Sequence, residues 1–304
     1  MTTEPTDQEH GHQGQGDSPK EILIFGDLHG QFDDGDLAFV EERQPELVLF
    51  LGDLGDEDPA IAREVRKIQA PFRILLGNHD AWESFRHDEI TDRLAELLGI
   101  VGEENIAYRL EEWPEFGLSL LGARPFSWGG PSLRSPAVYE ELYGIKTLED
   151  SSDTLIAAAS EAQAPILVLA HNGPKGLGSQ PGDIYGKDFG KPGGDWGDRD
   201  LQVAIKTLKE QGKEIPLVVA GHMHHRLAYP RGMERRLIAE YKGTFYTNPA
   251  RVPRIFESDS GETLRHYLSI RVEDGEILRL DQLLVSEDEV RRQDLFARLS
   301  SEEV

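Results

Sequence analysis

Short apolar runs alternate with longer mixed segments along most of this chain. The clearest runs are "EILIFG" at 21–26, "ELVLFLG" at 46–52, "PFRILLG" at 71–77, "PILVLA" at 165–170 and "IPLVVA" at 215–220. Apolar runs of this length that end in turn-forming or polar residues predict buried β-strands.

The segments between the runs have the spacing of amphipathic helices. In "DEITDRLAELLG" at 88–99, apolar side chains recur at helical intervals and Gly99 marks the end. Further helices are expected at 33–44, at 58–69, twice within 136–161 and at 198–212. Strands that alternate with helices in this way predict an α/β fold with a parallel sheet.

The two ends of the chain depart from this pattern. Residues 1–19 are polar and Gly-rich and predict a disordered tail. Further strands are expected at 116–123, at 244–248 and within 264–285, where "EDGE" marks a turn. We therefore expect one domain over 20–285, followed by a helical C-terminal extension over 286–304.

Composition narrows the class of protein. The 304 residues carry a formal net charge of −24. This charge argues against binding to a nucleic-acid backbone, which requires clustered Lys and Arg, and an acidic, soluble surface explains it. No apolar run is long enough to span a membrane. Because the chain has no cysteine and its first nineteen residues lack a signal-peptide pattern, we expect a cytoplasmic location.

Polar side chains follow each of the five apolar runs. They are Asp27 and His29, then Asp53, then Asn78, His79 and Asp80, then His171, and finally His222, His224 and His225. Ligands of open α/β sheets gather at the carboxyl ends of the strands. Burying so many carboxylates and imidazoles together is unfavourable unless a cation offsets it. Nitrogen and oxygen donors without sulfur suit Mn, Fe, Zn, Ni or Co.

The spacing and the number of these residues predict two ions. Asp27 and His29 are two residues apart, as are His222 and His224, so each pair leans to one side of an extended segment. The candidate ligands exceed what one ion needs; they are Asp27, His29, Asp53, Asn78, His171, His222 and His224. We expect two ions bridged by Asp53, an arrangement used for in-line attack on phosphorus.

These residues also carry a family resemblance. The series "GDLHG", "GDLGD", "GNHD", a lone histidine after a strand, and "GHMH" spans residues 26–224. It resembles the motifs GD-x-H, GD-x-x-D, GNH-D/E, H and GH-x-H of the calcineurin-like metallophosphoesterase superfamily, in the same order. The resemblance implies an αββα sandwich, in which mixed β-sheets are flanked by helices and the metal site lies at the strand carboxyl ends.

The same resemblance implies roles for the residues. Asp27, His29, Asp53 and His224 would hold one ion, and Asp53, Asn78, His171 and His222 the other. A hydroxide that bridges the ions would attack phosphorus, and His79, oriented by Asp80, would protonate the leaving group. We expect hydrolysis of a phosphomonoester or phosphodiester, with a phosphorylated small molecule such as a nucleotide as substrate.

Two alternatives to a small-molecule phosphoesterase stay open. A phosphoprotein phosphatase is less favoured, because the phosphatases of that kind follow GD with "VDRG", and here "LGDED" at 54–58 has no arginine. A non-catalytic scaffold with the same fold is less favoured because a scaffold has no use for the retained His79.

Residues outside the motifs supply candidates for substrate contact. The segment 171–200 is rich in glycine, and we expect it to cover the substrate through Lys175, Lys187 and Trp196, with a flexible surface loop as the alternative. Arg124 and Trp128 follow another predicted strand and could reach the same edge or serve packing alone. Asp56 is expected to hydrogen-bond a ligand imidazole, and His225 to point away from the ions.

Overall fold

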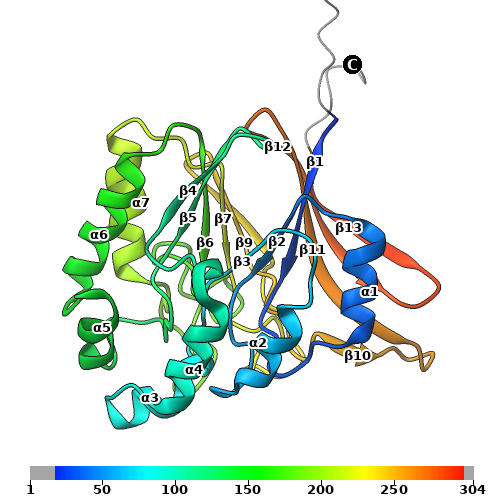
Figure 1. Ribbon diagram of the computed structural model, residues 1–304, viewed down its shortest axis with the longest axis horizontal. Coiled ribbons are helices and arrows are strands. Elements are labelled where there is room, and N and C mark those ends of the chain that lie inside the picture. Colours follow the sequence, from blue (N-terminus) through cyan, green and yellow to red (C-terminus); the bar gives the residue numbers. More distant parts are fainter. Residues whose placement is uncertain (1–17, 298–304) are drawn as a thin grey trace, which may run out of the picture.

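Two β-sheets pack face to face with helices on their outer sides (Figure 1). The computed structural model describes residues 18–297. One sheet has seven strands in the order β13-β12-β11-β1-β2-β3, with β10 beside β11. Its strands are β1 (Lys20–Phe25), β2 (Leu47–Phe50), β3 (Phe72–Ile74), β10 (Ile255–Glu257), β11 (Thr263–Glu273), β12 (Glu276–Val285) and β13 (Val290–Ala297).

The second sheet has six strands in the order β4-β5-β6-β7-β9-β8. They are β4 (Leu110–Trp113), β5 (Leu118–Gly122), β6 (Ile166–Ala170), β7 (Leu217–Ala220), β8 (Ile238–Tyr241) and β9 (Thr244–Thr247). β1, β2 and β3 are parallel in one sheet, and β5, β6, β7 and β9 are parallel in the other. The expected parallel strands are thus divided between two mixed sheets, and the αββα sandwich is confirmed.

Seven α-helices of the described residues flank the sheets. They are α1 (Asp34–Arg43), α2 (Pro59–Val65), α3 (Trp82–His87), α4 (Asp92–Val101), α5 (Pro136–Tyr143), α6 (Leu148–Ser160) and α7 (Arg199–Glu210), with 3₁₀ turns η1 (His79–Ala81) and η2 (Gly102–Glu104). α6 and α7 cover the outer face of the six-stranded sheet (Figure 1). α1 packs on the seven-stranded sheet, where the ring of Phe39 stacks on Tyr267 of β11 at 4.6 Å.

The helices follow the local rules that their sequences suggest. α7 buries Leu201, Ala204, Ile205 and Leu208, which lie three or four residues apart on one face. α1 begins with a capping box, in which the Asp33 carboxylate accepts from the backbone N–H of Asp36 and the Asp36 carboxylate accepts from that of Asp33. None of the helices in the described part of the chain has the length and apolarity needed to cross a bilayer.

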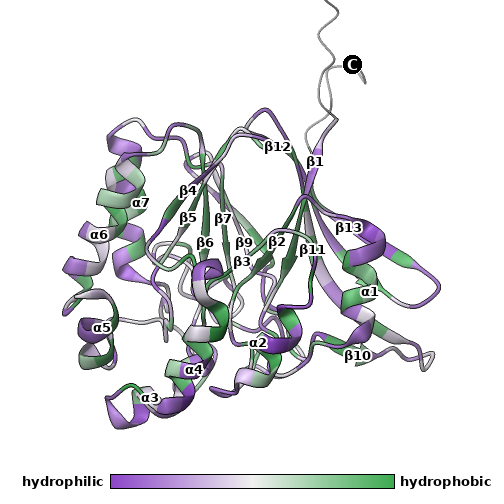
Figure 2. Ribbon diagram, viewed as in Figure 1, coloured by the Kyte–Doolittle hydropathy of each residue, from purple (hydrophilic) through white to green (hydrophobic). Residues whose placement is uncertain are grey.

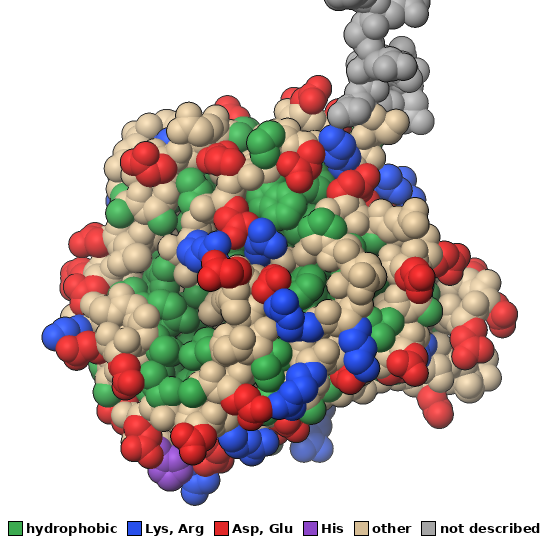
Figure 3. All heavy atoms as spheres, viewed as in Figure 1, with side chains coloured by type: hydrophobic (Ala, Val, Ile, Leu, Met, Phe, Trp, Pro, Cys, Tyr) green, Lys and Arg blue, Asp and Glu red, His purple; other side chains and the backbone are tan. Residues whose placement is uncertain are grey.

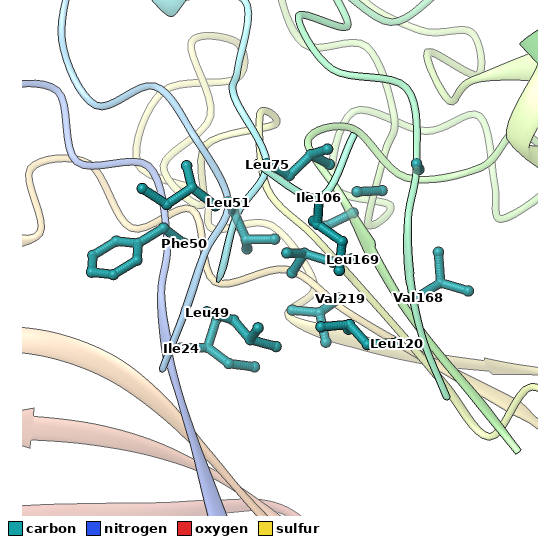
Figure 4. Close-up of a cluster of buried hydrophobic side chains, with 14 of the residues drawn as sticks. Ile24, Leu49, Phe50, Leu51, Leu75, Ile106, Leu120, Val168, Leu169 and Val219 are labelled. Atoms are coloured by element: carbon teal, nitrogen blue, oxygen red, sulfur yellow. The ribbon is translucent and has the colours of Figure 1, made fainter. Parts of the chain in front are cut away.

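The core lies between the two sheets. Figure 2 shows apolar residues concentrated on the strands and polar residues on the outer helix faces. In Figure 4, Ile24 and Leu49 of one sheet approach Leu120 and Val219 of the other, and all four are at most 2% exposed. This packing fixes the sheets relative to each other, so the strand ends at the lower edge of Figure 1 are held in place.

The part of the C-terminal extension that the structure describes forms a strand and not the predicted helix. Residues 290–297 form β13, which pairs antiparallel with β12 from Val285↔Val290 onward. The chain turns at Ser286, whose N–H donates to the carbonyl of Glu289. Backbone pairing with the edge of β12 outweighs the local helix preference of this charged segment, and charge is common on edge strands. The predicted tail over 1–19 and the end of the extension lie almost entirely outside the described residues.

Candidate metal centre

The carboxyl ends of five strands bring the predicted ligands together at one edge of the sandwich. β1, β2 and β3 come from one sheet, and β6 and β7 from the other. Three groups of three side chains each have their ligand atoms within 4.8 Å of one another. The first group is Asp27, His29 and His224, and the second is Asp53, His171 and His222. The third is His29, Asp53 and His79, which shares one residue with each of the others.

The first group places two imidazole nitrogens against each other. The Nε2 atoms of His29 and His224 lie 3.2 Å apart, and the Nε2 of His224 lies 3.7 Å from the Asp27 carboxylate. Burial lowers the pKa of both histidines, that of His224 to about 4, so both rings are neutral near pH 7. Burial and the neighbouring Asp53 raise the pKa of Asp27. A cation among these donors would favour the ionised carboxylate and bind the ring lone pairs.

The second group is oriented by the backbone. The Nδ1 of His171 lies 2.8 Å from the carbonyl of Leu51 and can only donate to it. Its Nε2 therefore carries the lone pair, which faces the Asn78 Oδ1 at 2.9 Å and an Asp53 oxygen at 3.4 Å. Three acceptors that converge in a buried position fit a cation between them.

Asp53 lies between the two groups. Its side chain is 1% exposed, and its two oxygens point in different directions. Oδ2 lies 3.5 Å from the Nε2 of His29, while Oδ1 lies 3.4 Å from the Nε2 of His171. The carboxylate thus offers one oxygen to each group, which is the arrangement required of a bridging ligand.

The backbone is strained and crowded around these side chains. His29, Asp53 and His222 have φ values of 45°, 47° and 64°, in the left-handed region that non-glycine residues rarely adopt. A methyl group at Gly77 would overlap Asp53, and one at Gly221 would overlap Asp27. The glycines next to the strand ends therefore leave the space that the carboxylates occupy.

His79 stands beside the ligands and is partly exposed. Its Nδ1 lies 2.6 Å from the Asp56 carboxylate, and its ring stacks on Trp82 with centroids 4.8 Å apart. Its ring also lies edge-on to His29 at 4.7 Å. Asp56 therefore contacts His79 instead of a ligand imidazole.

Asp80 does not have the contact that was expected of it. Its carboxylate is buried and accepts from the backbone N–H groups of Leu54, Gly55 and Gly77. These bonds join the turn after β2 to the turn after β3. Asp80 thus positions the loops that carry Asp53 and Asn78, and the side chain that orients the His79 ring is Asp56.

The predicted substrate contacts are only partly near the centre. Arg124 is buried and pairs with Asp198 at 2.8 Å and Asp200 at 2.7 Å, so it packs in the interior and does not face a substrate. Lys175 lines a separate pocket beside Leu177 and Tyr246. The Nζ of Lys187 lies over the rings of Phe189 and Trp196.

A pocket of about 460 Å³ opens beside the candidate ligands. Asp53, Asn78, His79, His222 and His224 line one side of it, and the remaining wall includes Trp82, Trp128, Arg134, Phe189, Trp196 and Arg226. Trp196 is thus at the site as expected. Trp82, Phe189, Arg134 and Arg226 were not identified from the sequence, although Trp82 follows His79 by three residues, which is one helical turn.

The Gly-rich segment is an ordered loop. The guanidinium of Arg235 donates to the carbonyls of Pro181, Asp183 and Gly186. Further backbone bonds join Asp198 to Gly173 and Trp196 to Tyr185. These hydrogen bonds attach the segment to its surroundings at several points. His225 is buried, its ring is outside both groups, and neither ring nitrogen has a hydrogen-bond partner among the described residues.

Known proteins resemble this chain in sequence and in fold. A sequence model of the calcineurin-like phosphoesterases matches residues 20–226. No curated protein matches. One solved structure has a TM-score of 0.53 at 11% identity, covering 87% of this chain and 99% of its own, which shows a shared fold.

Two other solved structures are less similar. The protein TT1561 of Thermus thermophilus has a TM-score of 0.49 at 12% identity, covering 92% of this chain and all of its own. An archaeal phosphodiesterase has a TM-score of 0.39 at 12% identity, with 87% of this chain and 99% of its own covered.

Proposed function

This chain belongs to the calcineurin-like phosphoesterase family, and we propose that it is a two-metal enzyme that hydrolyses a phosphomonoester or phosphodiester of a small molecule such as a nucleotide. The observation that carries the proposal is the position of Asp53. Its carboxylate is buried between two groups of side chains that contain neutral imidazoles. One of its oxygens faces His29 of the first group, and the other faces His171 of the second. Such an arrangement has a clear use only when cations occupy both groups.

This geometry supports a division of the candidate ligands between two ions. Asp27, His29, Asp53 and His224 would bind one divalent ion, and Asp53, Asn78, His171 and His222 would bind the other. When bound, the ions would lower the pKa of a water molecule and offset the charge of the phosphate oxygens. The identity of the ions and the cytoplasmic location stay predictions.

His79 is suited to give a proton to the leaving group. It lines the pocket beside Asn78 and Asp53. Because the Asp56 carboxylate accepts from Nδ1, the other nitrogen of the ring is free to donate towards a substrate oxygen. Asp56 would keep the ring in that orientation.

The positive charge needed for phosphate binding is local. The chain has a net charge of −24, and Figure 3 shows acidic side chains spread over one face. At the pocket, Arg134 and Arg226 are near the candidate ligands. Together with two divalent ions they would attract a phosphoester to this edge despite the acidic surface.

Hydrolysis of p-nitrophenyl phosphate and of its bis ester, with and without Mn²⁺, tests the proposal and distinguishes a monoesterase from a diesterase. Asp53→Ala should lower kcat/KM by more than about 100-fold and remove bound metal. Mutation of a residue that only hydrogen-bonds a metal ligand already lowers metal affinity or activity by about 10- to 100-fold, and the loss of a ligand should have a larger effect. Asp259→Ala, at an exposed loop position, is the control. Turnover of neither ester with any divalent metal would favour the scaffold alternative, and wild-type metal content in Asp53→Ala would contradict the bridge.

A further inference from the structure

Tryptophan side chains surround the pocket outside the metal-ligand groups. We propose that they form a stacking platform for the base of a nucleoside phosphate, and that this platform selects the substrate; the proposal rests on the phosphoesterase function proposed above. The platform consists of Trp82, Trp128 and Trp196, all of which line the same pocket as His79 and Asn78.

The rings extend outward from the reaction centre. Trp82 stacks on His79 at 4.8 Å, and Trp128 follows at 5.1 Å from Trp82. Trp82 is 37% exposed, although large apolar side chains are usually covered. A base joined to the phosphate through a ribose extends further from phosphorus than an aryl group bonded to a phosphate oxygen, so the base is the group that we expect to stack on the second ring.

Trp128 and Trp196 are held rigidly. The indole N–H of Trp196 donates to the carbonyl of Trp128 at 2.9 Å, and the N–H of Gly130 donates to the carbonyl of Trp196 at 2.8 Å. Gly130 has a φ of 80°, and a methyl group there would lie 3.1 Å from the Trp196 ring. The loop after β5 is therefore shaped to receive this indole.

Buried charges fix the two segments to each other. Arg124 pairs with Asp198, and the Asp198 carboxylate also accepts from the hydroxyl of Ser127 at 2.6 Å. Ser127 immediately precedes Trp128, and Asp198 lies two residues after Trp196. A platform fixed in this way loses little conformational entropy when a flat ligand stacks on it, which favours binding.

The pocket also offers hydrogen-bond donors at its wall. The guanidinium carbon of Arg134 lies 4.5 Å from the centre of the Trp128 ring, and Arg226 lines the same pocket. Bases carry ring nitrogens and carbonyl oxygens that accept hydrogen bonds, while the volume of about 460 Å³ suits a ligand of nucleotide size. A small aliphatic ester would gain nothing from the aromatic wall.

Substrate selectivity tests the platform. The values of kcat/KM for AMP, p-nitrophenyl phosphate and glycerol 3-phosphate are compared in the wild type, Trp128→Leu and Trp82→Leu, with the exposed Tyr241→Leu as control. In Trp128→Leu the ratio of AMP to glycerol 3-phosphate should fall by about tenfold or more, the effect of losing one stacked base. An unchanged ratio would overturn the proposal, and an equal loss for AMP and p-nitrophenyl phosphate would overturn the assignment to a nucleoside.

Calorimetric titration with adenosine separates this proposal from the phosphoesterase function. Adenosine has no phosphate, so its binding reports the platform alone. Saturable binding to the wild type that weakens in Trp128→Leu supports the platform even if no ester is hydrolysed. A wild type that hydrolyses esters, binds no adenosine and does not prefer AMP to glycerol 3-phosphate would overturn the platform and leave the phosphoesterase function intact.

Discussion

His79 differs from the candidate ligands in its surroundings. The Nδ1 of His79 lies 2.6 Å from the carboxylate of Asp56, which is not one of the candidate ligands. Exposure does not separate His79 from the ligands, because its side chain is 28% exposed and those of His29 and His224 are 20% and 40% exposed. A carboxylate that holds one ring nitrogen leaves the other nitrogen to face the pocket, which agrees with a proton donor.

Removing His79 should slow hydrolysis without removing metal. For His79→Ala we expect kcat to fall by about 10²- to 10⁴-fold with a poor leaving group, the usual contribution of a general acid, and much less with p-nitrophenolate. A leaving-group series combined with metal analysis measures this. The exposed His87→Ala serves as control. A uniform loss over the whole series would contradict the role as acid.

Asp56, and not Asp80 as expected, makes the contact with the His79 ring. Asp80 is next to His79 in the chain, and the family motif suggested that it orients the ring. In the structure its carboxylate turns back to the N–H groups of two loops, while Asp56 from the preceding loop reaches the imidazole. Adjacency in sequence does not give the direction of a side chain on a 3₁₀ turn such as η1.

At the scale of elements, the glycine after β7 sets the position of Asp27, a candidate ligand in the turn after β1. Gly221 does not have a positive φ, so alanine is tolerated by the backbone, but its methyl group would overlap an oxygen of Asp27. The strand end and the carboxylate would have to move apart. The first candidate metal position depends on this close approach.

Gly221→Ala should therefore weaken metal binding while the fold is retained. We expect the Mn²⁺ concentration for half-maximal activity to rise by about 10- to 100-fold, as for changes directly behind metal ligands. Gly99→Ala is a matched control, because no atom lies within 4 Å of the added methyl group in α4. Equal Mn²⁺ dependence of the two variants would show that the contact does not control the site.

The apolar runs predicted most of the elements, and the failures have physical causes. The interior strands β2, β6 and β7 are fully buried and β1 is buried except at Lys20, so their composition alone identifies them. β13 is an exposed, charged edge strand whose conformation comes from its partner β12, which no local pattern encodes. The ligands were predictable because each follows a buried strand. Trp128 and Trp196 were candidates from their loops, whereas Trp82, the first residue of α3, had no such signal.

At the scale of the whole molecule, burial of His266 links stability to pH. This histidine of β11 is 2% exposed, and burial, with Arg251 and Arg254 nearby, lowers its pKa to about 3. The unfolded chain takes up a proton near the ordinary value of 6.5, whereas the folded protein does not. The contribution to stability is therefore complete above pH 6.5 and is lost as the pH falls towards 3.

The comparison of His266→Gln with the wild type measures this effect. The variant should be less stable near pH 7, and the difference in the free energy of unfolding should shrink by up to about 1.4 kcal/mol per pH unit below 6.5. Urea unfolding between pH 7 and 5 provides the values. The exposed His87→Gln should follow the wild-type curve. A difference that stays constant with pH would show that His266 is not the titrating group.

Each candidate ligand group takes its donors from both halves of the sandwich. Asp27 and His29 leave β1 while His224 follows β7, and Asp53 follows β2 while His171 and His222 come from β6 and β7. Bound cations would then cross-link the two sheets, since neither ion could keep its donors if the sheets separated. The free energy of unfolding would therefore rise with the concentration of the divalent cation. The same ions that serve hydrolysis would also stabilise the contact between the two sheets.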